Sequence, residues 1–225
     1  FTSETEAAAE AFVLERYLRS CSQPALATLL AEVPSVMMWD DHDIMDGWGS
    51  FEEWRLDAPV GQGLFRVARE MFLLFQAGAP ASKLPGVCVD TEGRSLTLAV
   101  SFPGFSIVAP DLRSNRTPSQ ILDEHGWRCL DTALDRAQMS RHVFVLSSVP
   151  AIGPRVGTLE RFAGVTPGLR AYDDDFLDRW QSHTHREQWY RFLRKMAGDV
   201  ADRNHSLTIL SGEMHMAGRG TMRLE

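Results

Sequence analysis

Residues 94–114, with the sequence RSLTLAVSFPGFSIVAPDLRS, contain two short apolar runs that are separated by Pro103 and Gly104. A Pro-Gly pair between two such runs is a turn signal and is typical of a β-hairpin. We therefore predict two antiparallel strands here. The polar segment 111–116, DLRSNR, follows the second of them.

Outside this hairpin the chain alternates between helical and strand-like patterns. The spacing of apolar residues predicts helices over about residues 3–20, 24–33, 61–77, 118–137 and 174–203. Ser3 and Glu6 have the spacing of a capping box for the first helix. Short apolar runs predict further strands at 35–40, 142–150 and 206–215. This order is typical of an α/β fold with helices on the faces of a sheet, and we expect residues 1–225 to form one domain.

The composition limits the classes of function. The chain has 225 residues, of which 44% are hydrophobic and 24% are charged, and its formal net charge is −7. A net negative charge argues against a polyanion-binding surface, so nucleic acid is not an expected partner. No apolar run approaches the roughly 20 residues that span a bilayer, so we expect a soluble protein without a membrane partner.

The cysteines and the first residue bear on the origin of the chain. Cys21, Cys88 and Cys129 lie far apart, which favours buried free thiols over disulfides or a closely spaced thiolate zinc site. Free thiols favour a reducing compartment, and we expect a cytoplasmic location. Because the chain begins at Phe1 rather than at a methionine, we expect it to be the C-terminal portion of a longer domain.

Residues 36–50, VMMWDDHDIMDGWGS, place an apolar run directly before a group of charged and polar side chains. This acidic cluster consists of Asp40, Asp41, His42, Asp43 and Asp46. Crowded carboxylates at the end of a buried strand repel one another and lose hydration, so a cation or a set of hydrogen-bond donors has to compensate them.

A second polar pair, Glu213 and His215, follows the last predicted strand. Carboxylates and imidazoles from the ends of separate strands are suitable ligands for a first-row transition metal, and ligands collect at strand carboxyl ends in α/β folds. Either group alone is more typical of turns and helix caps. Taken together, the two groups favour a metal site.

Arg113 and Arg116 follow the second strand of the hairpin. Arginine suits bidentate contact with a phosphoryl group, and surface salt bridges are the alternative for this motif. His183 and His185 are two residues apart on a predicted helix. That spacing does not place them on one face, so we do not expect them to be paired metal ligands.

Five segments in this order carry a resemblance to a known family: WDDHDIMDGWGS, APDLRSNR, VLSSVP, DRWQSHTHR and LSGEMHMA. Together they resemble the PhoD-like alkaline phosphatases of the calcineurin-like metallophosphatase superfamily, over about residues 33–218. The resemblance implies an αββα sandwich of two sheets flanked by helices. It also implies a two-metal centre that hydrolyses phosphate monoesters or diesters.

The resemblance implies roles for individual residues. Asp41 matches a metal-ligand position, and Glu213 and His215 match the final metal-binding motif. The implied cofactors are divalent or trivalent ions such as Fe, Mn, Ca or Zn. His42 matches the histidine that acts as general acid or transition-state donor.

Substrate binding is assigned in the same way. The resemblance implies that Arg113, and with it Arg116, holds the phosphate of a small phosphate ester. Arg113 is therefore also expected to act in catalysis. Neither the particular ester nor an oligomeric state follows from these motifs.

The chain also departs from the pattern that it resembles. The first two metal motifs of the superfamily would lie upstream, and no residue before Trp39 replaces them. One alternative is therefore a catalytically silent fragment or degenerate relative with a structural or interaction role. Another is a hydrolase that uses Ser147 or Ser148, although no strained turn of glycines presents either as a nucleophile.

Overall fold

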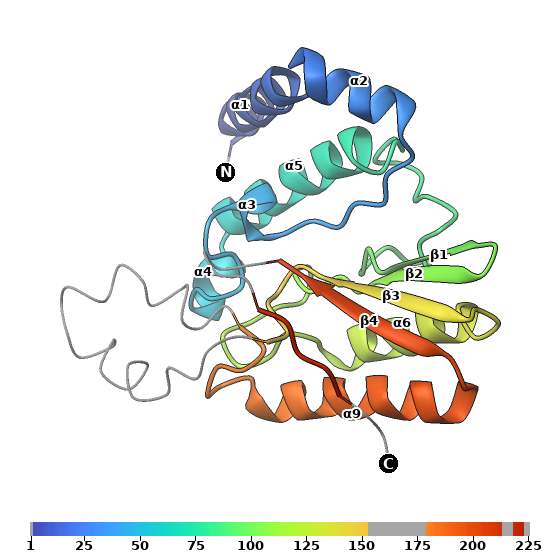
Figure 1. The fold of residues 1–225 in the computed structure, drawn as a ribbon. Coiled ribbons are helices and arrows are strands. Elements are labelled where there is room, and N and C mark those ends of the chain that lie inside the picture. The colour runs from blue at the N-terminus through green and yellow to red at the C-terminus, as the bar shows by residue number, and fades with distance from the viewer. Residues whose placement is uncertain (1, 153–178, 213–217, 223–225) are drawn as a thin grey trace.

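The computed structural model describes residues 2–152, 179–212 and 218–222. Within these ranges the chain forms one mixed four-stranded sheet with helices on both sides of it (Figure 1). The predicted α/β fold is confirmed. Of the two sheets that the resemblance implies, the described residues contain one. None of the described helices is both long and apolar enough to cross a lipid bilayer.

The strands lie in the order β1–β2–β3–β4. β1 (Leu98–Phe102) and β2 (Phe105–Ala109) form the predicted antiparallel hairpin. Gly104 in its turn has a φ of +90°, which glycine adopts without a steric penalty. β3 (His142–Ser147) and β4 (Ser206–Ser211) continue the sheet in parallel with β2. The carboxyl ends of β2, β3 and β4 therefore lie at one edge of the sheet.

Two helices, α6 (Glu124–Arg136) and α9 (Arg186–Arg203), cover one face of the sheet (Figure 1). The apolar sides of these helices pack against the inward-facing residues of the strands and form the larger hydrophobic core. Its fully buried members include Val108, Val145, Leu130 and Phe192. Burial of this core accounts for the position of both helices.

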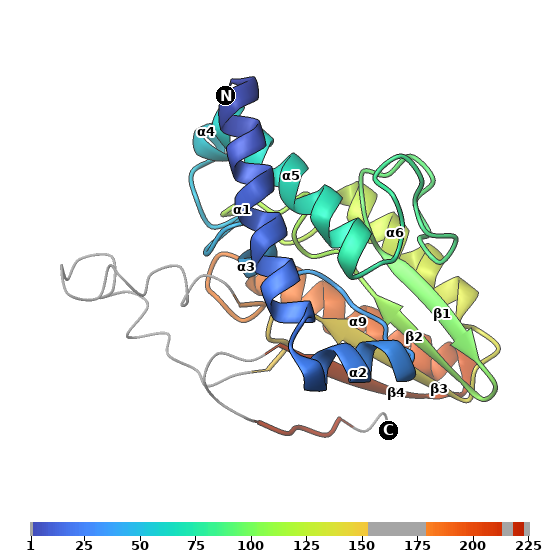
Figure 2. The same ribbon diagram turned by 90° about the horizontal axis from the view of Figure 1, so that it is seen from above.

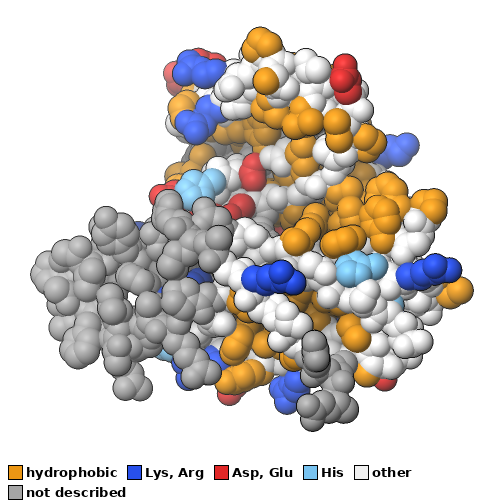
Figure 3. Space-filling model, in the orientation of Figure 1, with side chains coloured by type: hydrophobic (Ala, Val, Ile, Leu, Met, Phe, Trp, Pro, Cys, Tyr) orange, Lys and Arg blue, Asp and Glu red, His pale blue; other side chains and the backbone are white. Residues whose placement is uncertain are grey.

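A helical layer lies over the other face (Figure 2). It contains α1 (Ser3–Cys21), α2 (Pro24–Glu32) and α5 (Pro59–Phe75), with the one-turn helices α3 (Asp41–Ile44) and α4 (Glu53–Leu56) beside them. An apolar groove of about 550 Å³ separates α5 from β1 and β2. Hydrophobic side chains gather between the helical layer and the sheet on the face shown in Figure 3.

The predicted strand at residues 35–40 is wrong. Residues 34–40 have no regular secondary structure and pair with no strand of the described sheet. Trp39 is fully buried, but its ring packs against Phe65 and Phe72 of α5, with centroid separations of 5.4 and 5.5 Å. An apolar run does not reveal which element it packs against, and here that element is a helix.

The capping residues of one helix and the starts of two others differ from the prediction. The hydroxyls of Thr2 and Thr5 form the capping box of α1, one residue before Ser3 and Glu6. Within the described residues, α6 and α9 begin later than predicted because turns precede both helices. The start of α6 is set by Asp123, whose side chain accepts a hydrogen bond from the N–H of Gly126 and thereby caps the helix.

Candidate metal and phosphate site

Arg113 follows β2 at the carboxyl edge of the parallel strands, and its side chain is buried. Its Nε donates a hydrogen bond of 2.7 Å to Oδ1 of Asp40, and Nη2 donates to the same oxygen. Nη2 also lies 3.4 Å from Oδ1 of Asp41. Nη1 donates to the carbonyl of Trp48 over 3.3 Å. One buried cation therefore compensates two adjacent carboxylates of the acidic cluster.

A buried carboxylate holds the turn that carries this arginine. Four N–H groups donate to Asp111: those of the Trp39 indole (2.8 Å) and of the Leu96 (2.7 Å), Arg113 (3.1 Å) and Ser114 (3.0 Å) backbone. Because these donors lie on three separate segments, Asp111 joins the segment before α3, the loop before β1 and the turn after β2. The position of Arg113 depends on this junction.

Helix α3 places Asp41 and His42 next to each other at the end of the apolar segment. Asp41 is buried, and its Oδ2 accepts a 2.8 Å hydrogen bond from the N–H of Gly47. The side chain of His42 is 76% exposed, with Nδ1 3.4 Å from Oδ1 of Asp41 and Nε2 3.3 Å from Oδ1 of Asp46. Acidic and histidine side chains accordingly appear together over α3 in Figure 3. Two carboxylates flank the ring and leave it open to a ligand.

The acidic cluster contains donor atoms for a metal ion. Carboxylate oxygens of Asp40 and Asp41 and a ring nitrogen of His42 all lie within 4.8 Å of one another. Oxygen and imidazole donors suit first-row transition metals. The buried charge of Arg113 offsets part of the carboxylate charge. The two carboxylates therefore offer ligands for one metal ion beside the imidazole of His42, and the remaining ligands would have to come from outside this cluster.

The predicted ligands Glu213 and His215 lie outside the described residues. Gly212, which precedes them, donates its N–H to the carbonyl of Ser147 over 2.8 Å. β4 therefore brings the chain to the same edge of the sheet as Arg113. Figures 1 and 2 both show α3 on this side of the sheet.

Arg116 is buried against the turn that follows α3. Gly49 in this turn has a φ of +92°, and a Cβ added there would lie 2.5 Å from Cδ of Arg116. Only glycine allows both this backbone conformation and this close approach. Arg116 contacts Gly49, and Arg113 binds the carbonyl of Trp48, so both arginines support the segment after the acidic cluster.

Two other candidates have structural partners. The buried hydroxyl of Ser147 donates to the carbonyl of Val149 over 2.6 Å and accepts from Nε1 of Trp180 over 3.1 Å. This hydroxyl is not presented to solvent, so the alternative gains no support from Ser147. The hydroxyl oxygen of Ser148 is also buried, and it has no hydrogen-bond partner among the described residues. His185 is buried before α9, and its Nδ1 lies 2.9 Å from the hydroxyl of Ser182.

Sequence reasoning missed the roles of Asp40 and Asp111. Asp40 precedes α3 and accepts the hydrogen bonds of Arg113. Asp111 accepts from the N–H two residues ahead, which is the geometry of an Asx turn, and an aspartate directly after a strand signals such a turn. Its bond with Trp39 has no comparable signal, because 72 residues separate the two.

Carboxylates, an imidazole and arginines gather at the carboxyl edge of the parallel strands in this α/β fold. Together they form a candidate site for a metal ion and a phosphate. The chain belongs to the PhoD-related phosphatase family, whose model matches residues 1–176. This match confirms the resemblance noted in the sequence. It includes the acidic cluster and Arg113, whereas Glu213 and His215 lie beyond it.

A relative is found in yeast. The uncharacterized protein YGR266W of Saccharomyces cerevisiae is 24% identical over 279 aligned residues, and the alignment covers 99% of this chain and 40% of the yeast protein. The chain thus spans less than half the length of this relative. No solved structure is significantly similar to the chain.

Proposed function

We propose that this chain contributes to the active site of a metal-dependent hydrolase that cleaves phosphate monoesters or diesters. One observation carries the proposal: in a member of a phosphatase family, the carboxylates of Asp40 and Asp41 lie within 4.8 Å of each other and of the imidazole of His42, so potential metal ligands stand beside a potential proton donor. Arg113 holds this group at the carboxyl edge of the parallel strands.

In this proposal Asp41, Glu213 and His215 hold metal, and the geometry adds Asp40 to the candidates. When bound, metal ions at such a site offset the charge of the phosphoryl group and activate water. The oxygen-rich donor set suits Fe, Mn, Ca or Zn. Asp41 is already oriented by the N–H of Gly47, so it offers its second oxygen without a large rearrangement.

His42 is proposed as the proton donor. It is the most exposed member of the three-residue group, and its ring is held between Asp41 and Asp46. A positioned imidazole donates a proton to the departing oxygen of the ester and thereby lowers the barrier to its release.

The arginines are proposed to act on the phosphate of a small ester substrate. In the structure the guanidinium of Arg113 is buried and bound to Asp40, so it orients the carboxylates. Direct contact of Arg113 or Arg116 with a phosphoryl oxygen stays a prediction. It requires a phosphate to approach from the side of the acidic cluster.

The test is an assay of the full polypeptide that contains this chain, with chromogenic phosphate monoesters and diesters. We expect turnover that depends on added Mn, Fe, Ca or Zn and disappears with a chelator. His42→Ala is expected to lower turnover by about 10²–10⁴-fold while the bound metal, measured by elemental analysis, is unchanged. The control is Asp57→Asn, because Asp57 is exposed and lies outside the acidic cluster. Equal loss of metal and turnover in His42→Ala would contradict this division of roles.

A second candidate function is a catalytically silent relative with a structural or interaction role. The ion pair of Arg113 with Asp40 favours it, because an arginine already compensates a carboxylate that a metal would otherwise bind. The same assay separates the two functions. A full polypeptide that binds no metal and turns over no ester would support the silent alternative.

A further inference from the structure

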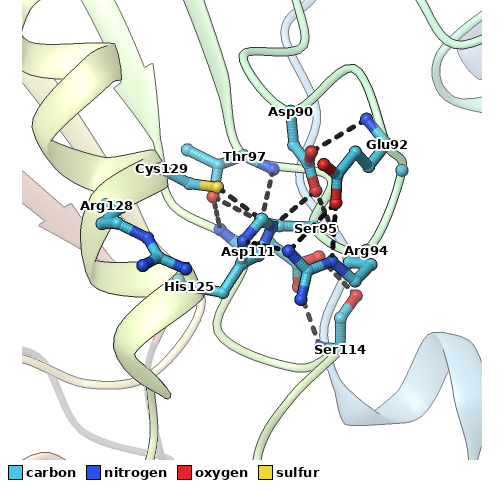
Figure 4. Close-up of polar contacts among 12 residues, drawn as sticks. Asp90, Glu92, Arg94, Ser95, Thr97, Asp111, Ser114, His125, Arg128 and Cys129 are labelled. Atoms are coloured by element: carbon cyan, nitrogen blue, oxygen red, sulfur yellow. Dashed lines mark hydrogen bonds and ion pairs between the residues drawn. The ribbon is translucent and has the colours of Figure 1, made fainter.

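A second group of potential ligands lies outside the acidic cluster, between α6 and the loop before β1 (Figure 4). Asp90 belongs to this loop, and His125 and Cys129 lie one turn apart on α6. One ligand atom from each residue lies within 4.8 Å of the other two. The side chains of Asp90 and His125 are 4% and 12% exposed, and Cys129 is buried, so the group is enclosed but reachable.

The carboxylate and the thiol approach the same ring nitrogen. Oδ2 of Asp90 lies 2.7 Å and Sγ of Cys129 lies 3.5 Å from Nε2 of His125. A nucleophilic cysteine triad would instead place the carboxylate on the other nitrogen of the ring. A metal ion at the position of the Nε2 proton would face all three ligands. The group is therefore arranged for coordination rather than for nucleophilic catalysis.

The distances are close to those of a tetrahedral site. Zinc with ligand bonds of about 2.0–2.3 Å separates its ligand atoms by roughly 3.3–3.7 Å. The distance between His125 and Cys129 already fits this range. Asp90 would have to retreat from His125 by less than about 1 Å.

The ligands are also oriented by their surroundings. Oδ1 and Oδ2 of Asp90 accept hydrogen bonds from the N–H groups of Glu92 (3.0 Å) and Ser95 (2.9 Å). His125 and Cys129 have i, i+4 spacing, which places both on one face of α6. A loop carboxylate fixed by backbone N–H groups and two ligands on one rigid helix form a preorganised set.

Arg94 controls the proton on the imidazole. Its guanidinium lies 2.9 Å from Nδ1 of His125, and because arginine only donates, Nδ1 accepts and the proton sits on Nε2. This tautomer points a proton at the place of the metal. The side chain of Arg94 is 56% exposed and pairs with the exposed Glu92 over 3.0 Å. Only this surface ion pair opposes a movement of Arg94 that would let the proton pass to Nδ1.

We propose that Asp90, His125 and Cys129 form a zinc site that is separate from the acidic cluster. A thiolate, an imidazole and a carboxylate suit zinc and do not suit the hard ions Mg²⁺ and Ca²⁺. Binding releases the thiol proton of Cys129 and moves the imidazole proton from Nε2 to Nδ1, so one proton leaves for each ion bound. The wide spacing of the three cysteines in the sequence argues against a zinc site with several thiolate ligands. The proposed site is compatible with that spacing because it uses one thiolate.

The site supports the acidic cluster indirectly. The hydroxyl of Ser95 lies 2.9 Å from that of Thr97, and Thr97 accepts a hydrogen bond from the N–H of Asp111 over 2.9 Å. Zinc would clamp the loop of Asp90 and Ser95 to α6 and so stiffen the support of Asp111. The site supplies three protein ligands, so its fourth position would be open to a water molecule, and its role in the fold would be to hold this loop against α6.

The test is a titration of the metal-free chain with Co²⁺, which reports thiolate ligation by a charge-transfer absorption. We expect one cobalt per chain with this band, and displacement by Zn²⁺. The acidic cluster has no thiol, so the band distinguishes the two sites. Cys129→Ser is expected to lose the band, whereas the control variants Cys21→Ser and Cys88→Ser keep it. Circular dichroism verifies that each variant is folded.

Two further variants test the geometry. Asp90→Asn is expected to weaken cobalt binding by at least about tenfold, because it removes a ligand charge. Arg94→Gln is expected to tighten binding several-fold, because it removes a positive charge and the donor that holds the proton on Nε2. A parent chain without the band, a band that persists in Cys129→Ser, or weaker binding by Arg94→Gln would overturn the proposal.

Discussion

Arg113 and Asp40, 73 residues apart in the sequence, form an ion pair in which two guanidinium nitrogens donate to one carboxylate oxygen. The Arg113 side chain is 1% exposed and that of Asp40 is 40% exposed. The arginine is therefore a buried charge whose partner reaches the surface. It connects the carboxyl end of β2 to α3 and fixes the place of the acidic cluster.

We expect Arg113→Met to lower the free energy of unfolding by about 3 kcal/mol, because Asp41 would stay buried without its cation. Arg113→Lys should cost less, since it keeps the charge and loses the forked geometry. Urea denaturation measures the free energy of unfolding of both variants. The matched control is Arg55→Met, whose exposed pair with Glu52 should contribute less than about 1 kcal/mol. Equal losses at positions 113 and 55 would show that Arg113 is not a structural charge.

Asp111→Asn tests the junction of three segments that holds the turn of Arg113 in place. An asparagine keeps one acceptor oxygen but turns an NH₂ group toward N–H groups that now donate to the carboxylate. We expect a loss of about 3 kcal/mol in the free energy of unfolding, because buried donors are left unpaired. The control Asp57→Asn, at an exposed position, should change it by less than about 0.5 kcal/mol. A loss at position 111 no larger than at position 57 would contradict the assigned role.

Local signals predicted much of the fold. The turn at Pro103 and Gly104 identified the hairpin, and apolar periodicity identified α5 within two residues of its start. The strand predicted before Asp40 is wrong because this segment packs against a helix that lies later in the chain. An apolar run is compatible with any buried position, so no local rule separates a strand from a segment that packs on a helix.

The candidate site also has a part that the local sequence predicts and a part that depends on the tertiary fold. Asp41 and His42 are neighbours in sequence, and α3 keeps them together. The compensating charge of Arg113 comes from a distant segment, and its pairing with Asp40 depends on the tertiary fold. The group of Asp90, His125 and Cys129 is likewise assembled from a loop and a helix. Only the pair on the helix, with its i, i+4 spacing, could have been noticed in the sequence.

Thiol reactivity offers a third prediction. Burial raises the pKa of Cys88 to about 11, and burial together with the nearby Asp90 raises the pKa of Cys129. Because the thiolate is the reactive form, both should react slowly with iodoacetamide at about pH 8. Cys21, at the end of α1, is the least buried of the three. We expect rapid alkylation of Cys21 in the folded, metal-free chain, and of all three after unfolding, as measured by peptide mass spectrometry. The control Cys21→Ser should lose the rapid reaction, and rapid labelling of Cys88 would contradict the prediction.

The last prediction concerns pH and the contact between α1 and α3. The hydroxyl of Tyr17 donates to Oδ1 of Asp43 over 3.0 Å, and Gln76 donates to both side chains. Burial, and then the negative charge of Asp43, raise the pKa of Tyr17 above its usual range. The neutral phenol is therefore favoured by folding. Its contribution to stability is complete below the unfolded pKa of about 10 and is lost as the pH rises from there toward the folded pKa.

Tyr17→Phe should accordingly lower the free energy of unfolding by about 1 kcal/mol near neutral pH, because one hydrogen bond is removed. Above about pH 10 the parent protein loses stability through this group and the variant does not, so the difference between them should narrow. Urea denaturation at about pH 8 and about pH 11 measures it. Tyr190→Phe is the control, because Tyr190 is exposed on α9 and its substitution should change the free energy of unfolding by less than about 0.5 kcal/mol at about pH 8. A gap at position 17 that stays constant or widens with pH would mean that folding does not favour the neutral phenol.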